Sequence, residues 1–168
     1  EPEGWTIDVI PITAEVQKLT PYSVYMMEHG YQAAFILGFS LIDPWMKEFR
    51  TTHIPTVLYD NYIKGNPNVA SVGCDNQEGF ELAVKHLVSL GHKKIGLISG
   101  PSDSYIMKAR YNAYLRAMEK YGLEINEDYI GIGYFVAEST RKYIPRLVNK
   151  GCTAILFSHD VRAISAIT

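Results

Sequence analysis

One unit recurs three times in this chain: an amphipathic stretch, a glycine, a few polar residues and then an apolar run typical of a strand. The glycines are Gly30, Gly91 and Gly151, and the apolar runs that follow them span 33–37, 95–98 and 153–157. A glycine in this place ends a helix in the left-handed conformation that other residues avoid. Apolar strands that alternate with helices form parallel sheets covered on both faces. The repeat therefore predicts an α/β fold built on parallel sheets.

The clearest helix is expected between Asp75 and Gly91. Asp75 offers a side-chain acceptor at the N-cap and Glu78 a carboxylate three residues later, which is the capping-box pattern. Apolar residues at 80, 83, 84, 87 and 88 then repeat at helical spacing. We expect further helices within 21–29, near 44–49, over about 104–121 and from about 138 to 150. Strands are expected at 6–10, 33–37 and 56–59.

The sequence changes character after Asn61, where 62–68 has the composition of an exposed turn. The extended segment 69–74 then leads into the helix after Asp75, so it is the best candidate for a crossing between two lobes. We predict that 1–65 is part of an N-terminal lobe and 66–168 part of a C-terminal lobe. The chain begins almost directly on a strand and stops shortly after a helix begins, so we expect both lobes to be incomplete.

The composition favours an ordinary globular protein over a nucleic-acid or membrane protein. Apolar residues make up 47% of the 168 residues and charged residues 20%. No apolar run reaches the roughly 18 residues of a spanning helix. The formal net charge of −2 gives no electrostatic footprint for nucleic acid, so a DNA-reading part would lie outside this chain. Cys74 and Cys152 are interpreted as reduced core thiols, with a disulfide left open.

Enzyme signatures are absent from the sequence. It contains neither a P-loop, nor a dinucleotide fingerprint, nor a G-x-S-x-G elbow. The five histidines lack zinc-site spacing, so we expect no metal and no cofactor. His159 directly before Asp160 is weak evidence for acid–base chemistry, because sequence neighbours at a helix start point in different directions. We therefore expect a binding protein, not an enzyme.

Candidate binding residues follow the predicted strands, because ligands of open parallel sheets bind beyond the carboxyl ends of the strands. These segments are polar and aromatic, and that mixture suits a small polyhydroxylated ligand. They contain Phe39, Asp60, Ser104, Phe135, His159 and Asp160. Each has an alternative reading: Asp60 and Asp160 as helix or turn caps, Phe135 as core, and Arg110 on the following helix as a solvated or ion-paired side chain.

A set of motifs resembles the effector core of LacI/GalR transcriptional regulators over roughly 35–166. The set comprises IPTVLYD at 54–60, VGCDN at 72–76 with Gly79, HL at 86–87, GHKKI at 91–95, Gly100, Arg110 with AY at 113–114 and AM at 117–118, TAI at 153–155, and HD at 159–160 with Ala163. The resemblance implies a type I periplasmic-binding-protein fold, with two Rossmann-like lobes and the effector between them.

The same resemblance implies roles for individual residues. Arg110 matches the arginine that grips ligand hydroxyls, and Phe135 matches the aromatic residue that stacks on the ligand. Asp60 and Glu78 lie on or near cleft positions, and the loop from Ser104 to Ile106 lines the pocket in relatives. Two positions depart from the family pattern: His159 stands where asparagine is common, and Ala113 stands where glycine is usual.

The implied protein is a cytoplasmic LacI-type repressor or regulator whose effector domain binds a sugar or a related metabolite. Kinship also implies operator DNA as a partner, read by a helix-turn-helix outside this chain, and a homodimer. The alternative is a secreted sugar-binding protein of an ABC transporter with the same fold. A sugar-processing enzyme is the third hypothesis, and it would require turnover of the bound ligand.

Overall fold

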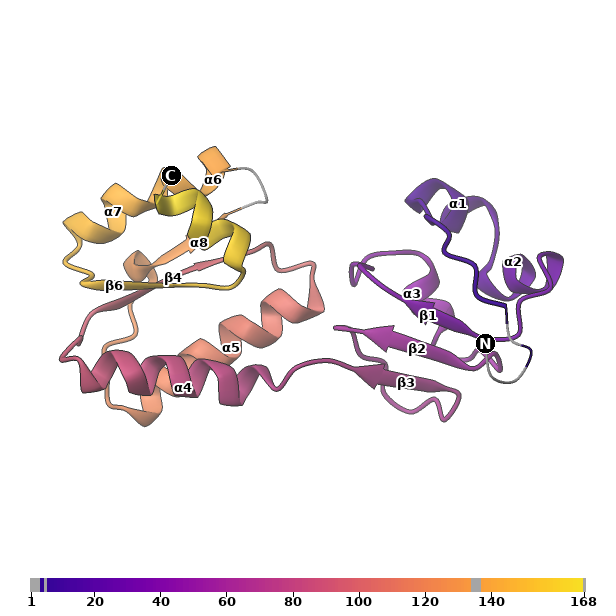
Figure 1. Ribbon diagram of the computed structural model, residues 1–168, viewed down its shortest axis with the longest axis horizontal. Helices are drawn as coiled ribbons and strands as arrows, with labels where there is room; N and C mark the ends of the chain where they lie inside the picture. The colour runs from indigo at the N-terminus through magenta and orange to yellow at the C-terminus, as the bar shows by residue number, and fades with distance from the viewer. Residues whose placement is uncertain (1–3, 5, 134–136, 168) are drawn as a thin grey trace. The chain divides into compact units, whose positions relative to one another are not determined.

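The computed structural model describes residues 4, 6–133 and 137–167. The chain forms two compact units, Glu1–Ser71 (unit 1) and Val72–Thr168 (unit 2), each with one three-stranded sheet (Figure 1). The division falls a little after the boundary proposed from the sequence, because the strand that begins at Val69 joins the sheet of unit 1. The assignment of the units to the lobes of a larger domain stays a prediction.

The described residues of unit 1 form three helices and three strands, beginning with two helices and ending with two strands. The elements are α1 (Ala14–Leu19), α2 (Tyr22–Glu28), β1 (Ala34–Ile36), α3 (Trp45–Glu48), β2 (Thr56–Tyr59) and β3 (Val69–Val72). The strand order is β1-β2-β3, and β1 runs parallel to β2, with Ala34 opposite Thr56. Four of these elements, α2, β1, α3 and β2, match the predicted helices and strands closely. The strand β3 lies within the segment 69–74 that was expected to be extended, and α1 was not predicted.

The core of unit 1 lies between its helices and one face of the sheet. Tyr22 of α2 packs its ring 5.2 Å from that of Trp45 and 4.9 Å from that of Phe49, above the fully buried Leu58 of β2. The other face carries Phe35, which is 57% exposed, and the exposed Tyr59. The expected cover on both faces is therefore wrong for this sheet, within the residues that the structure describes.

Unit 2 has a longer alternation of helices and strands. Its elements are α4 (Asn76–Ser89), β4 (Ile95–Ser99), α5 (Tyr105–Lys120), the 3-10 helix η1 (Glu127–Tyr129), β5 (Ile130–Ile132), α6 (Ala137–Arg141), α7 (Tyr143–Asn149), β6 (Ala154–Phe157) and α8 (Asp160–Ile167). The strand order is β5-β4-β6, and β4 is parallel to both neighbours.

Helices cover both faces of the unit 2 sheet, as the sequence predicted (Figure 1). On one face Leu97 packs with Val84 of α4 and Tyr114 of α5. On the other, Ile98 packs with Leu147 of α7. Successive residues of β4 thus enter different clusters, because side chains alternate across a strand. The central strand is buried at every position, which fixes its carboxyl end as a rigid base for a site.

The repeated glycines have the predicted role. Gly30, Gly91 and Gly151 have φ angles of 70°, 89° and 87°. These positive angles end α2, α4 and α7 at little steric cost. In each case the next element along the chain is a strand, so the glycines predicted the order of these elements correctly.

Three sequence-based expectations were wrong. The segment 6–10 forms no strand, and Val9 in it is 94% exposed; a strand needs a neighbouring backbone to pair with, and the described residues provide none there. The helix expected from 138 to 150 is divided between Arg141 and Tyr143, because the ring of Pro145 clashes with a helical carbonyl four residues earlier. Cys74 is exposed rather than in the core, whereas Cys152 is buried; both thiols are free.

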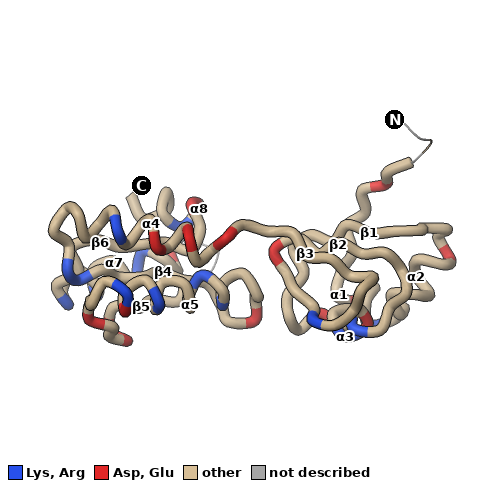
Figure 2. Tube along the Cα trace, turned by 90° about the horizontal axis from the view of Figure 1, so that it is seen from below, with Lys and Arg blue, Asp and Glu red and all other residues tan. Residues whose placement is uncertain are grey.

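The surface carries charges of both signs. Basic and acidic residues are interspersed along both units (Figure 2). This agrees with the small net charge and with a surface that is not specialised for nucleic acid. None of the helices in the described part of the chain combines the length and the apolar character that crossing a membrane requires.

Candidate functional site

Buried polar side chains in unit 2 gather at the carboxyl end of its sheet. Ser99 ends β4, Ser158 follows β6, and Thr140 and Arg162 reach the same end from α6 and α8. All four are at most 3% exposed, and they are the buried polar residues of the described part of unit 2. Burial of polar groups is costly unless they are hydrogen-bonded. Their gathering at the edge where open α/β sheets bind ligands therefore marks this edge as the candidate site.

Arg110 connects three elements at this edge. It lies in α5, and its Nε donates to Oδ1 of Asn76 at 3.0 Å, at the start of α4. Its Nη1 donates to the backbone oxygen of Ser158 at 2.6 Å, directly after β6. Bonds with a charged donor are the stronger kind, so the guanidinium is held in one orientation. Arg110 is half-buried, and both of these bonds run to uncharged acceptors.

Arg162 lies deeper in the same region, and the sequence analysis did not select it. Its side chain is 1% exposed, and Nη1 lies 3.2 Å from Oγ of Ser158 and 3.6 Å from Sδ of Met107. Burial, and then the positive charge of Arg110, lower the pKa of Arg162 from its ordinary value. Two cations therefore share one small region around Ser158.

Ser104 and Ile106 lie at the start of α5, one turn before Arg110. Ser104 is the N-cap residue, and its side chain makes no capping hydrogen bond. The first turn of α5 also contains no acidic residue. A helix start of this kind presents backbone N–H groups and positive partial charge to polar or anionic groups. Ser104, Ile106 and Arg110 therefore lie in the first part of α5, and ligand contact by these three residues stays a prediction.

Glu78, His159 and Asp160 occupy helix starts in unit 2. Glu78 is exposed in α4, and its backbone N–H is capped by Oδ1 of Asp75 at 3.0 Å. Asp160 accepts from the N–H of Val161 at 2.9 Å, with a side chain that is 85% exposed. Nδ1 of His159 lies 2.9 Å from that carboxylate. Asp160 therefore bonds the backbone within the first turn of α8, while ligand contact by these three residues stays a prediction.

The two predicted site residues of unit 1 behave differently from each other. Asp60 follows β2 with a φ angle of 53°, a left-handed conformation that aspartate tolerates better than most residues. Its Oδ1 is buried without a hydrogen-bond partner among the described residues, which is a costly arrangement. Phe39 packs 6.1 Å from the ring of Phe49 and 6.2 Å from that of Trp45. Phe135 lies outside the described residues.

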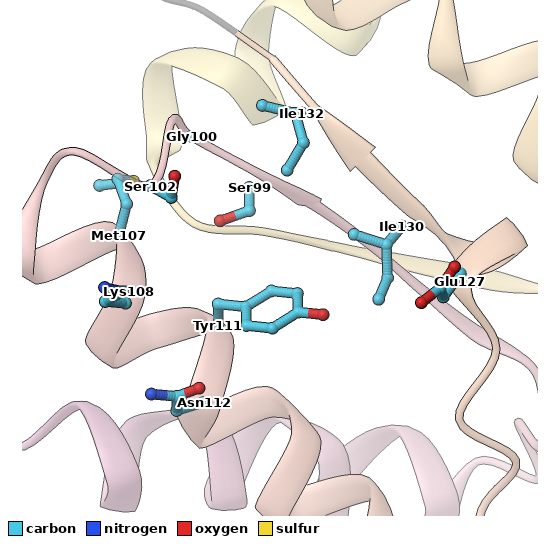
Figure 3. Close-up of a pocket in the computed structure, with 10 residues that line it drawn as sticks. All are labelled: Ser99, Gly100, Ser102, Met107, Lys108, Tyr111, Asn112, Glu127, Ile130 and Ile132. Atoms are coloured by element: carbon cyan, nitrogen blue, oxygen red, sulfur yellow. The ribbon is translucent and has the colours of Figure 1, made fainter.

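A cavity of about 420 Å³ lies beside α5 in unit 2 (Figure 3). It is lined from α5 by Lys108, Tyr111 and Asn112, and from the sheet by residues that include Ser99 and Ile132. Residues 108, 111 and 112 lie on the side of the helix opposite to residue 110, since each residue turns the helix by roughly 100°. None of the predicted binding residues named above lines this cavity, but its lining includes Ser99, Gly100 and Met107, which also border the Arg162 region.

The described residues contain no group of three His, Cys, Asp or Glu side chains that could hold a metal ion. The candidate site is instead made of hydroxyls, amides and guanidiniums. Such groups donate and accept hydrogen bonds to hydroxyls and oxyanions of a small molecule. Chemically, the arrangement is suited to recognition.

Sequence reasoning missed Arg162 and did not single out Asn76 as a partner of Arg110. Arg162 is the only charged residue of α8 after Asp160, in an otherwise apolar or small-residue stretch. That isolated charge is the signal that could have found it, because arginine is rarely buried without a specific partner. No local signal pairs Asn76 with Arg110, which lies 34 positions later.

A three-stranded parallel sheet with polar and cationic groups at its carboxyl end defines a ligand-binding α/β module. The family model of the periplasmic binding protein-like domain matches residues 84–168, and the chain belongs to this family, in the form found in effector-binding domains of LacI-type regulators.

Similar proteins agree with this assignment. The chain is 25% identical over 169 residues to the HTH-type transcriptional repressor PurR of Aliivibrio salmonicida (strain LFI1238). This match covers 99% of the chain and 50% of the repressor. A LacI-family regulatory protein from Chloroflexus aggregans matches with a TM-score of 0.79 and 24% identity, covering 94% of this chain and 57% of that one. The transcriptional regulator CelR, solved with cellobiose, matches with a TM-score of 0.72 and 24% identity, over 85% and 45%.

Nearly the whole chain takes part in the match to the PurR repressor of Aliivibrio salmonicida, but the chain spans only about half the length of that repressor. The family model covers α5, β5, β6 and α8, and therefore the region around Arg110. The fold expectation of a type I periplasmic-binding-protein-like α/β domain is confirmed.

Proposed function

We propose that the chain binds a small polyhydroxylated metabolite, a sugar or a sugar derivative, as the effector of a LacI-type repressor. The observation that carries this proposal is the anchoring of Arg110 to Asn76 and Ser158 at the carboxyl end of the unit 2 sheet. The anchors use Nε and Nη1, so the Nη2 side of the guanidinium is the part that a ligand would meet. A fixed, half-buried guanidinium suits hydroxyl recognition because little entropy is lost when the ligand binds.

The regulatory part of the proposal rests on the relatives. The matched protein from Aliivibrio salmonicida is a transcriptional repressor by name, and CelR is a regulator solved with a disaccharide. By analogy, this chain would bind its effector in the cytoplasm, and a helix-turn-helix outside the chain would read operator DNA, in a homodimer. Asp60, Glu78, Phe39, Phe135, His159 and Asp160 stay predicted contributors to the effector site.

Calorimetric titration tests the binding function. The 168-residue chain is titrated with a panel of sugars and sugar phosphates, and the ligand is recovered and analysed afterwards. The proposal expects saturable heat with one of these compounds and full recovery of the unchanged ligand. Conversion of the ligand to product would point to the enzyme alternative, and a panel without any saturable heat would contradict the sugar class.

The coding sequence upstream of Glu1 separates the regulator from the secreted binding protein. A helix-turn-helix encoded there is expected for the regulator. A signal peptide or lipobox at the same place would contradict the regulator and support a solute-binding protein of an ABC transporter. The two outcomes are distinct because secreted proteins need an export signal and DNA-binding proteins need a DNA-reading part.

A further inference from the structure

Arg162 lies where the carboxyl ends of all three strands of unit 2 come together. Its Nη1 lies 3.2 Å from Oγ of Ser158, at the end of β6, and 3.6 Å from Sδ of Met107 in α5. The ends of β4 and β5 are marked by Gly100 and Gly133, which also face the Arg162 side chain. This one buried side chain bonds to Ser158 after β6, contacts Met107 of α5, and lies near the ends of β4 and β5.

Both glycines leave room for neighbouring side chains, and Gly100 does so for this arginine. A Cβ atom on Gly100 would lie 2.8 Å from Nη2 of Arg162 and 2.7 Å from Sδ of Met107. A Cβ on Gly133 would lie 3.7 Å from Cδ of Arg162 and 2.9 Å from Oγ1 of Thr140. Neither glycine has a positive φ angle, so backbone conformation does not require them. Close approach to a neighbouring side chain is the remaining reason for glycine here.

Ser158 is the point where Arg162 and Arg110 meet. Its backbone oxygen accepts from Nη1 of Arg110 at 2.6 Å, and its hydroxyl accepts from Nη1 of Arg162 at 3.2 Å. Two like charges near one residue repel each other, and a buried guanidinium is costly to desolvate. An apolar side chain of similar length would fill the space without that cost. Arginine at 162 adds directed hydrogen bonds that an apolar side chain lacks, including the one to Oγ of Ser158.

From this geometry we infer that Arg162 is a positioning residue of the effector site, which holds Ser158 so that its carbonyl fixes the guanidinium of Arg110. This inference rests on the proposed function for its biological meaning. Arg162 is too deeply buried to meet the ligand itself, and it acts through Ser158 and then Arg110. A buried side chain, Arg162, thus determines the orientation of the Arg110 guanidinium that would face the ligand.

The test measures how fast the Nε–H proton of Arg110 exchanges with water, by NMR on the labelled 168-residue chain. The signal is identified by its loss in Arg110→Lys. Arg162→Met keeps the length of the side chain and removes its donors. With Ser158 released, Arg110 loses one of its two anchors, and we expect exchange to become about tenfold faster, the ratio that loss of one such hydrogen bond produces.

Three further variants complete the design. Arg162→Lys keeps one cationic donor and is expected to restore part of the slow exchange, which mere filling of space would not do. Arg116→Met makes the same substitution at an exposed arginine of α5, bonded to Gln77 at 3.3 Å, and should leave the Arg110 signal unchanged. Ser158→Ala removes only the hydroxyl and should reproduce the faster exchange.

Unchanged exchange in a folded Arg162→Met chain overturns the inference. If that variant does not fold, the result from Ser158→Ala decides in the same way, because the carbonyl that accepts from Arg110 is still present. The measurement needs no effector. Failure of this inference therefore leaves the proposed function standing, and failure to bind any sugar leaves the exchange result valid.

Discussion

Arg110 donates from Nη1 to the backbone oxygen of Ser158 across 2.6 Å, joining α5 to the end of β6 over 48 positions of sequence. The acceptor is a backbone oxygen directly after β6, in a residue whose hydroxyl also accepts from Arg162. The donor sits on a 16-residue helix that packs against the same sheet. The predicted ligand-binding arginine is thus joined to the carboxyl end of the unit 2 sheet.

The Arg110→Ala substitution tests the energy of this anchoring. It leaves Oδ1 of Asn76 and the carbonyl of Ser158 without their charged donor, and we expect a loss of about 2 kcal/mol in the free energy of unfolding. Urea denaturation of the 168-residue chain measures it. Arg116→Ala, on the exposed side of the same helix, should change the free energy by no more than about 0.5 kcal/mol. Equal losses in the two variants would contradict the anchoring.

Two glycines of unit 2 should respond to alanine in opposite ways. Gly79 lies inside α4 with no atom within 4 Å of an added Cβ. Alanine there should raise the free energy of unfolding by about 0.5–1 kcal/mol, because glycine is a poor helix former. A Cβ on Gly131 would lie 2.7 Å from Cγ of the Tyr143 ring, so alanine should lower it by about 1–3 kcal/mol. Thermal unfolding of both variants checks the signs, and a stabilised Gly131→Ala would refute this packing.

The two thiols should differ in reactivity. Cys152 is 7% exposed, and burial raises the pKa of its thiol, so less thiolate is present at any given pH. Cys74 is exposed. We expect iodoacetamide at mildly alkaline pH to label Cys74 first, and Cys152 only after unfolding in urea, with mass spectrometry locating the adducts. Equal labelling rates in the folded chain would be inconsistent with the burial of Cys152.

Asp128 should make stability depend on pH in the acid range. Nζ of Lys150 lies 2.6 Å from its Oδ2, and this hydrogen bond lowers the pKa of the carboxyl from its ordinary value. A lowered pKa in the folded state stabilises the chain above the unfolded-state pKa of about 3.9, and this contribution disappears as the pH falls through the folded-state value.

The matching variant is Asp128→Asn, which removes the charge and keeps the shape. Its unfolding temperature should lie slightly below that of the unchanged chain at neutral pH, since the ion pair is exposed and therefore weak. The difference should close as the pH falls below about 4, where Asp128 becomes neutral too. A difference that stays constant down to strongly acid pH would show that Asp128 acts through something other than its charge.

The order of elements could be predicted from sequence because its signals are local. A glycine after an apolar periodic stretch ends a helix wherever it occurs, as Gly91 and Gly151 do. The segment 6–10 has an equally apolar pattern, yet its pairing depends on a second strand, which no local pattern reveals. Pro145 was a readable local signal for the break before α7, and the prediction overlooked it.

The candidate site was partly predictable for a similar reason. The rule that ligands bind at the carboxyl ends of strands pointed to the loops around Ser104 and Ser158, which are local features. The role of Arg162 depends on space left by Gly100, far away in sequence, so only the folded structure reveals it. Phe39 shows the opposite case, since an aromatic residue after a strand can face a ligand or, as here, pack against Phe49.

The most direct test of the effector-binding role compares thermal stabilisation by ligand in the unchanged chain and in Arg110→Ala. A sugar or sugar phosphate present at a hundred times its dissociation constant contributes about 2.7 kcal/mol, which corresponds to a rise of roughly 5–10 °C in the unfolding temperature. We predict such a rise with at least one compound for the unchanged chain, and its loss in Arg110→Ala with Arg116→Ala unaffected. The same rise in Arg110→Ala would contradict the central claim that Arg110 anchors the effector.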